Sequence, residues 1–380
     1  MILRAGKSNR NGLRLVSDPP MLAEILARRI KDEGPITFRD WMQSALYDPL
    51  FGYYCRADSE RWGRKGDYRT SPERTPLFAA TFARYFADVY EQLGSPGQWT
   101  IIETGAGNGS FAEIALTTLE QQFPKVYEAT QYVVEEIGGQ SNEVAKGKLT
   151  KFGERVRFGS AEENKSAEAG IVFSNELLDA FPVHRVVREG GALREMYVTL
   201  DADGAFIWMT GPISTERLSK YFALVGKELS DEGQIAEVNL EIETWLERAG
   251  RLFQKAHIVT VDYGDEASNL LAPERRQGTA RAFRRHQFQD LLKTPGENDI
   301  TTTVDWTFVR RLGDKLGLRT ERFERLDQFL LHEGLLDQLE YMTGQADSDS
   351  EEVSLRAGAR EMIFPNGMSA SFQVLVQRKG

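Results

Sequence analysis

Hydrophobic positions follow two different spacings along this chain, and from residue 99 onwards the two spacings alternate. Short apolar runs typical of buried strands are followed by stretches in which apolar residues recur every three or four positions, as on one side of a helix. Strands that alternate with helices are typical of a parallel sheet built from βαβ units, so the expected fold class is α/β. The predicted strands are 99–104, 131–136, 155–159, 170–175, 257–263 and 318–323, with a closing strand in the C-terminal segment SASFQVLVQRK.

The chain before residue 95 is predicted to be helical at three places. Residues 37–45 form a helix that Thr37 caps at its start, because a threonine hydroxyl can accept a hydrogen bond from a free backbone N–H. An aromatic-rich helix follows from about residue 76 to residue 93. The first helix, at 19–33, has apolar residues on one side, namely Leu22, Ile25, Leu26 and Ile30.

Residues 183–213 interrupt the parallel pattern. Three short strands, VHRVV, REMYVTL and AFIWMTG, are joined by Gly190-Gly191 and Asp203-Gly204. Paired turn residues between short apolar runs are typical of hairpins, so we predict an antiparallel excursion here.

The remaining segments complete a division into four regions. Helices are expected at about 215–229 and 236–254, whereas the acidic, polar stretch 344–352 is predicted to be a mobile loop. The regions are a disordered tail at 1–18, an N-terminal helical region at 19–95, a core of 96–182 and 255–380, and an inserted hairpin and helical cap at 183–254.

The most informative local motif is a glycine-spaced turn after the strand WTII. Glu103 is followed by Gly105, Gly107 and Gly109, and glycine permits a tight turn with a ligand against bare backbone. The dinucleotide fingerprint G-x-G-x-x-G would need glycine where Ser110 stands. An acid before the turn would repel a pyrophosphate but suits S-adenosylmethionine, which carries an ammonium and a sulfonium. A glycine-rich turn with an incidental acid is the alternative interpretation.

Acids also follow two neighbouring strands of the predicted sheet. The second strand ends in Glu135 and Glu136, and an acid there can accept hydrogen bonds from both ribose hydroxyls of a nucleoside. Because side chains alternate, one of the two faces the ligand crevice; the alternative is that both are solvated. The fourth strand ends in Asn175 and Glu176, with Asp179 three residues later. Asn175 as N-cap, with the two acids in the first turn of a helix, explains these residues equally well.

Three other segments are less specific. GDYRTSPE (66–73) fits a loop that leads into a helix, with Ser71 as cap and Pro72 at the helix start. Asp262-Tyr263-Gly264 can be explained simply as residues that end a strand. RRQGTARAFRRH (275–286) fits a solvated helix or an internal counter-charge, and its functional alternative is an anchor for an acidic substrate segment.

Composition narrows the function classes. The formal net charge of −10 over 380 residues argues against a dedicated nucleic-acid binder. A single cysteine, Cys55, excludes an internal disulfide and a cysteine-rich metal site, and the histidines lack metal-ligand spacing, so no metal is expected. No apolar run reaches the length of a membrane-spanning helix. The basic first 14 residues lack the apolar core of a secretory signal. These residues could be a short mitochondrial-type presequence or a disordered tail, and we expect a disordered tail. The protein is therefore expected to be cytoplasmic.

Several motifs in order resemble the MidA-like methyltransferases. The resemblance runs from about residue 35 to residue 377 and implies a Rossmann-like core with extra N-terminal helices, an inserted segment over the crevice, and S-adenosylmethionine as cofactor. It favours Glu136 over Glu135 for the ribose and adds Ser71 and Pro72 to the cofactor site. IGGQS (137–141) departs from the family by lacking a proline, and GNG replaces an arginine-containing loop. The motifs are ITFRDWMQSALYDPLFGYY (36–54), GDYRTSPE (66–73), ETGAGNGSF (103–111), SNELLDAFPVHR (174–185), VDYG (261–264) and GTARAFRRH (278–286).

The resemblance also implies a reaction. The family includes the mitochondrial complex I assembly factor, which methylates an arginine on a subunit of respiratory complex I. The resemblance therefore implies a protein acceptor for this chain as well. A guanidinium is protonated and delocalised, so carboxylates must localise it; we assign this role to Glu176 and Asp179, oriented by Asn175. A small-molecule methyltransferase and a non-catalytic assembly or scaffold protein are the alternatives. The glycine spacing and Glu103 disfavour a nicotinamide-dependent oxidoreductase. Neither the acceptor nor the oligomeric state follows from the sequence.

Overall fold

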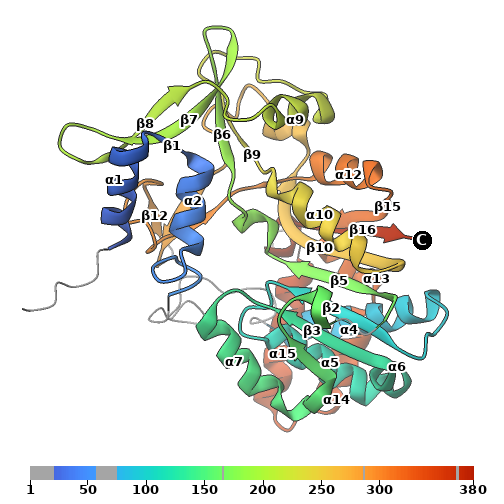
Figure 1. Cartoon of the computed structure of the whole chain (residues 1–380). Helices are drawn as coiled ribbons and strands as arrows, with labels where there is room; N and C mark the ends of the chain where they lie inside the picture. Colours follow the sequence, from blue (N-terminus) through green and yellow to red (C-terminus); the bar gives the residue numbers. More distant parts are fainter. Residues whose placement is uncertain (1–20, 57–74, 165–166, 286, 365–367) are drawn as a thin grey trace, which may run out of the picture.

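An eight-stranded sheet organises the chain (Figure 1). The structure is a computed structural model that describes residues 21–56, 75–164, 167–285, 287–364 and 368–380. Five neighbouring strands run parallel, and one antiparallel strand lies between two others at one edge, so the α/β class is confirmed. In spatial order the strands are β15 (Arg319–Arg325), β16 (Phe372–Lys379), β10 (Lys255–Asp265), β5 (Ala169–Asn175), β2 (Trp99–Thr104), β3 (Thr130–Glu135) and β4 (Val156–Phe158), with β14 (Val304–Asp305) beside β10.

Helices cover both faces of this sheet, which is why its strands are apolar at successive positions. Ile101 and Ile102 of β2 are both fully buried, and they belong to two different hydrophobic cores. The core around Ile101 is closed by α4 (Pro76–Gln92), α5 (Ser110–Gln122), α13 (Leu326–His332), α14 (Leu335–Gly344) and α15 (Asp349–Ile363). The core around Ile102 is closed by α9 (Arg217–Val225), α10 (Glu241–Leu252) and α12 (Trp306–Lys315). Shorter helices are α6 (Pro124–Ala129), α7 (Gly139–Leu149), α8 (Ala161–Asn164) and α11 (Ala267–Leu270).

A second, antiparallel sheet lies beside the first and confirms the predicted hairpins (Figure 1). It buries Val183 and Val198 against the N-terminal helices α1 (Leu22–Glu33) and α2 (Phe38–Tyr47). The division of the chain into a core and an inserted cap stays a prediction. The strands of this sheet are β1 (Ile36–Thr37), β7 (Ala192–Leu200), β6 (His184–Glu189), β9 (Ile235–Val238) and β8 (Phe206–Gly211).

The two N-terminal helices follow the predicted pattern. Thr37 caps α2, because its hydroxyl accepts a hydrogen bond from the Asp40 N–H at 3.1 Å. On α1 the predicted apolar side is buried except at Ile25, which is 37% exposed. Of the described helices, none combines the length and the apolar character needed to cross a bilayer.

Three local predictions are wrong. The helix predicted at 236–254 begins only at Glu241, because Ala236 and Val238 alternate inward as part of β9. The stretch 344–352 is not wholly a loop, since Ser348 accepts a hydrogen bond from the Glu351 N–H and starts α15. The arginine-rich run 275–286 contains a strand, not a helix, in a small sheet of β12 (Gln287–Gln289), β11 (Arg281–Arg284) and β13 (Asp299–Thr301). The predicted tail at 1–18 lies outside the described residues.

Candidate cofactor and acceptor site

A cavity of about 550 Å³ opens at the carboxyl ends of the parallel strands. The chain order reverses between β2 and its neighbour β5, and open α/β sheets bind ligands at such a switch point. The volume is in the usual range for a small-molecule site. The floor is made of Thr104, Gly105, Glu135, Glu136, Ile137, Gly159, Ser160, Leu177, Phe181 and Pro182, and the roof of Gln43 and Tyr47 from α2 with Glu241, Thr244, Trp245 and Arg248 from α10.

The glycine turn has the backbone that the motif predicts. Gly105, Gly107 and Gly109 have φ values of +75°, +56° and +74°, a region that side chains other than glycine rarely adopt. A Cβ on Gly109 would also lie 2.9 Å from the Cβ of Ala145. Gly105 lines the cavity, and the Gly107 N–H donates to a carboxylate oxygen of Glu136 at 2.7 Å. The turn therefore lies against the cavity wall.

Glu103 lies below this turn and does not line the cavity. It is 5% exposed, and Oε2 accepts a hydrogen bond from the Tyr132 hydroxyl at 2.8 Å. Burial raises the pKa of Glu103 to about 8, because the charged form loses its hydration. Its predicted role toward a cationic cofactor stays a prediction.

The raised pKa of Glu103 predicts a pH dependence of stability. A carboxyl whose pKa is higher in the folded than in the unfolded state stabilises the fold below its ordinary pKa of 4.5, and this contribution is lost as the pH rises through 8. Between pH 6 and pH 9 the free energy of unfolding of the wild type should therefore fall by roughly 1–3 kcal/mol more than that of Glu103→Gln. Urea denaturation of both proteins at the two pH values measures this; parallel pH dependences would show that Glu103 does not titrate as described.

The two candidate ribose acids have different partners. Glu135 lies in an ion-pair network: Arg248 of α10 binds both of its oxygens and also Glu162, and the Ala161 N–H donates to Oε1 of Glu135 at 2.7 Å. Glu136 instead accepts from the backbone N–H groups of Gly107 and Gly138, at 2.7 and 2.6 Å. Both line the cavity, and the glycine turn donates to the backbone carbonyl of Glu135 but to the carboxylate of Glu136, which supports Glu136 as the candidate ribose acid.

This difference predicts unequal effects on cofactor affinity. Glu136→Gln should weaken S-adenosylmethionine binding by about 10-fold or more, since a hydrogen bond to a charged group is lost. Glu135→Gln should have a smaller effect, because both oxygens of Glu135 are already bound by Arg248. Isothermal titration of both variants compares them directly, and a larger loss in Glu135→Gln would move the ribose to Glu135.

The segment after β5 is a strained turn, so the helix expected there is absent. Asn175 is the last residue of β5 rather than an N-cap, and Glu176 has a φ of +50°. A single 3₁₀ turn, Leu178–Ala180, follows. A glutamate in the left-handed region costs about 1 kcal/mol or more, and such strain is common at functional sites. The Glu176 N–H donates to the Val261 carbonyl at 2.9 Å, which helps to hold the turn.

The turn brings Asp179 into a buried acidic cluster with Glu176 and Asp262. Asp179 is 5% exposed, and Oδ2 accepts from the Tyr263 hydroxyl at 2.7 Å. Its other oxygen, Oδ1, is buried and has no hydrogen-bond donor among the described residues, and the same holds for Oδ1 of Asn175. Burial, together with the negative charge of Glu176, raises the pKa of Asp179 to about 7. Two buried oxygens, Oδ1 of Asp179 and Oδ1 of Asn175, are thus without a donor in the described part of the chain.

Asp262 and Tyr263 are the functional candidates that sequence reasoning missed. Asp262 is fully buried at the end of β10, where Oδ2 accepts from the N–H groups of Leu178 and Asp179 at 2.9 and 3.3 Å. Burial, and then the charges of Asp179 and Glu176, raise the pKa of Asp262 well above its usual range. The motif VDYG contained the signal, since polar residues at the end of a strand beside β5 face the same crevice.

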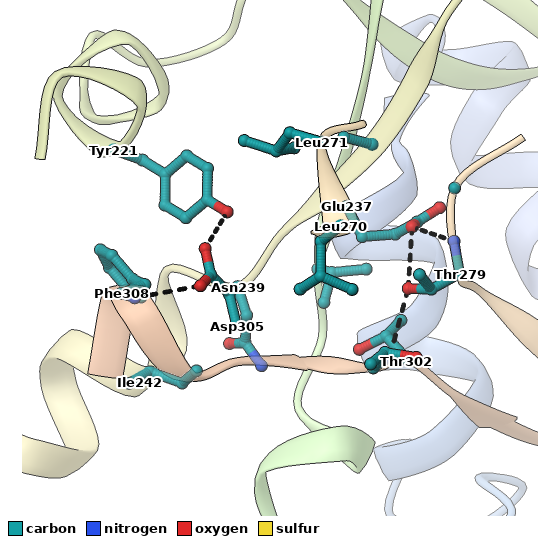
Figure 2. A pocket seen from close by; sticks show the side chains of 14 residues that line it. Tyr221, Glu237, Asn239, Ile242, Leu270, Leu271, Thr279, Thr302, Asp305 and Phe308 are labelled. Atoms are coloured by element: carbon teal, nitrogen blue, oxygen red, sulfur yellow. Dashed lines mark hydrogen bonds between the residues drawn. The ribbon is translucent and has the colours of Figure 1, made fainter. Parts of the chain in front are cut away.

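A second, small cavity lies on the other side of the 178–179 turn (Figure 2). Its volume of about 20 Å³ admits about one water molecule. Asn239, which lines it, donates to the Leu178 carbonyl at 2.9 Å, and Thr302 donates to the Asp179 carbonyl at 2.9 Å. On the far wall the Tyr221 hydroxyl donates to Oδ2 of Asp305 at 2.6 Å (Figure 2). The hydrogen bonds from Asn239 and Thr302 help to hold the turn, whereas the Tyr221–Asp305 pair does not contact it.

Two further sequence candidates are the segment GDYRTSPE and the arginine-rich run. Ser71 and Pro72 lie outside the described residues. Within the arginine-rich run, Arg275, Arg276 and Arg284 form ion pairs with Asp265, Asp231 and Glu297. Those pairs agree with the counter-charge interpretation.

The cavity fits S-adenosylmethionine. Ile137, next to Glu136, is 64% exposed and can contact a flat apolar base. Glycines form the wall beside Glu136, and the buried oxygens of Asn175 and Asp179 lie at the end of β5 and in the turn that follows it. The described residues contain no group of three or more His, Cys, Asp or Glu that could hold a metal ion.

Comparisons with known proteins agree with this fit. Residues 81–324 match a family described as "Putative S-adenosyl-L-methionine-dependent methyltransferase". A crystal structure from Burkholderia thailandensis, of an inferred methyl transferase bound to S-adenosyl-homocysteine, is 26% identical with a TM-score of 0.81 and covers 94% of this chain and 92% of its own. These findings confirm a methyltransferase that uses S-adenosylmethionine.

Two curated relatives carry a more specific name. The protein arginine methyltransferase NDUFAF7 homolog, mitochondrial, of Drosophila melanogaster is 25% identical over 94% of this chain and 85% of its own length. The protein arginine methyltransferase NDUFAF7, mitochondrial, of Mus musculus is 24% identical over 93% and 83%. The prediction of a cytoplasmic protein is contradicted by these names. It rested on the missing apolar core of a secretory signal, which does not distinguish the cytoplasm from the mitochondrion.

Proposed function

This chain belongs to the S-adenosyl-L-methionine-dependent methyltransferase family that its sequence matches, and from this premise we propose that it methylates arginine side chains on a protein acceptor. Two relatives named protein arginine methyltransferase support the proposal. The observation that carries it is the buried carboxyl group of Asp179, whose Oδ1 has no donor among the described residues and which lies close to Glu176 and Asp262.

An arginine side chain has the chemistry that this cluster lacks. Its guanidinium is always positively charged and presents five N–H donors in one plane, so it can satisfy two carboxylates at once. An approaching cation also lowers the pKa of a neighbouring carboxyl group, which offsets the effect of burial on Asp179. The site therefore favours a planar cationic acceptor.

The proposed mechanism assigns a task to each residue of the turn. Bound S-adenosylmethionine supplies an electrophilic methyl group. Glu176 and Asp179 bind the guanidinium and localise its positive charge, which leaves the reacting nitrogen with an available electron pair. Asn175 orients Glu176, since its Nδ2 donates to Oε1 at 3.3 Å. Glu176 then accepts the proton that the methylated nitrogen releases.

We propose a subunit of respiratory complex I as the first acceptor to test, on the strength of the family resemblance. Mass spectrometry should compare methylarginine on cellular proteins in a strain that lacks the gene, in the same strain complemented with the wild type, and in one complemented with Glu176→Gln. The proposal predicts a methylarginine that disappears on deletion and returns only with the wild type. Unchanged protein methylarginine, with loss of a methylated small molecule, would favour a small-molecule methyltransferase instead.

A further inference from the structure

Tyr263 and Asp262, adjacent at the end of β10, hold the 178–179 turn in two different ways. Asp262 binds the backbone, through the N–H groups of Leu178 and Asp179. Tyr263 binds the side chain, through a hydrogen bond of 2.7 Å from its hydroxyl to Oδ2 of Asp179. The ring of Tyr263 packs edge-on against Phe372 of β16, with the ring centres 5.6 Å apart. The hydroxyl is therefore fixed by the sheet itself.

A single fixed donor determines how the Asp179 carboxyl group is turned. Since Oδ2 is bound to Tyr263, Oδ1 is the oxygen left over, and it is buried with no donor in the described part of the chain. A buried acceptor without a partner is costly, and a donor on a bound ligand can satisfy it. The pairing with Tyr263 thus decides which oxygen a ligand meets.

We infer that Tyr263 is a positioning residue for methyl transfer: it fixes the Asp179 carboxyl group so that Oδ1 is left for a donor on the acceptor side chain. This inference rests on the proposed function, because the donor is there the guanidinium of an arginine. Tyr263 does not touch the reacting atoms and acts through Asp179.

Tyr263 also affects the charge of Asp179. Burial is the largest cause of the raised pKa values of Asp262 on β10 and Tyr47 of α2, to which the charge of Asp179 contributes. For Asp179 itself, burial and then the negative charge of Glu176 on the same turn raise the pKa. The hydrogen bond from Tyr263 opposes them, because it lowers the pKa of Asp179. Without that bond, ionisation of Asp179 needs a higher pH.

The test is Tyr263→Phe, which keeps the ring and removes the hydroxyl. We expect S-adenosylmethionine affinity to be unchanged, and transfer to an arginine peptide to fall about 10-fold or more at pH 6. The acid limb of the pH–rate profile should move up by about one pH unit, with recovery of the rate at pH 9. Tyr221→Phe is the matched control, since it removes a comparable buried tyrosine–aspartate hydrogen bond to Asp305 and should leave the profile in place.

Two further measurements keep the inference separate from the choice of acceptor. The pKa of Asp179, followed by carboxyl-carbon NMR in the protein without acceptor, should rise in Tyr263→Phe whether or not arginine is the substrate. If Tyr263→Phe does not fold, Asp179→Asn should shift the acid limb from its wild-type position, because Asp179 then no longer titrates and only Glu176 does. An unchanged Asp179 pKa in Tyr263→Phe, or an acid limb that stays at its wild-type position in Asp179→Asn, overturns the inference. A raised pKa without any arginine methylation overturns only the proposed function.

Discussion

Glu176→Gln is expected to lower methyl transfer by at least about 100-fold while S-adenosylmethionine binds as tightly as before. Electrostatic groups that act on the reacting centre are worth losses of this size when they are removed. Glutamine keeps the shape and the strained backbone at φ +50°, so the change isolates the charge. Glu176 does not line the cofactor cavity, which is why affinity should survive.

The control for this variant is Glu128→Gln. Glu128 lies exposed on α6, directly before β3 and thus at the opposite end of the sheet from the cavity. The Glu128→Gln substitution removes the same charge from the protein, and it should leave S-adenosylmethionine binding and methyl transfer at wild-type values. Transfer by Glu176→Gln at the wild-type rate, with bound cofactor, would exclude Glu176 from the reaction.

Gly107→Val is expected to weaken S-adenosylmethionine binding by roughly 100-fold or more, equivalent to about 2.7 kcal/mol. Gly107 lies in the turn at the cavity wall with φ +56°, and its N–H holds the carboxylate of Glu136. A β-branched side chain is strained at that φ and would occupy space beside the ligand. Both the turn and the carboxylate of Glu136, the predicted ribose acid, should therefore be displaced.

Gly190→Val separates cofactor binding from backbone strain. Gly190 has a similar φ of +61° in the β6–β7 hairpin, and a Cβ there would meet no atom within 4 Å. Its loss of stability should resemble that of Gly107→Val, but its cofactor affinity should be that of the wild type. Isothermal titration on both folded proteins decides the matter. Equal affinities in the two variants would remove the glycine turn from the cofactor site.

The sheet and the glycine turn could be predicted from sequence because their signals are local. The apolar run before Glu103 predicts a buried strand, and three glycines at alternate positions require the positive φ values that the turn has. The start of α10 was misplaced because Ile235–Val238 is too short for a helical spacing and a strand to be told apart.

The acceptor side could be predicted only in part. Asn175, Glu176 and Asp179 were marked by their place at the end of a strand, but their turn is set by contacts across the sheet. Asp262 reaches the Leu178 N–H over a sequence separation of 84 residues. That contact follows from the pairing of β5 with β10, in which Asn175 lies opposite Val261, and no local pattern encodes it. The positive φ of Glu176 is imposed by the same contacts.

The most direct measurement is the chemical form of the methyl group after transfer. Purified protein is incubated with methyl-labelled S-adenosylmethionine and protein from a strain that lacks the gene, and the acid hydrolysate of the protein fraction is separated into amino acids. We predict label in methylarginine with the wild type and none with Glu176→Gln. Label on another amino acid, or only in the low-mass fraction, would contradict arginine as the acceptor.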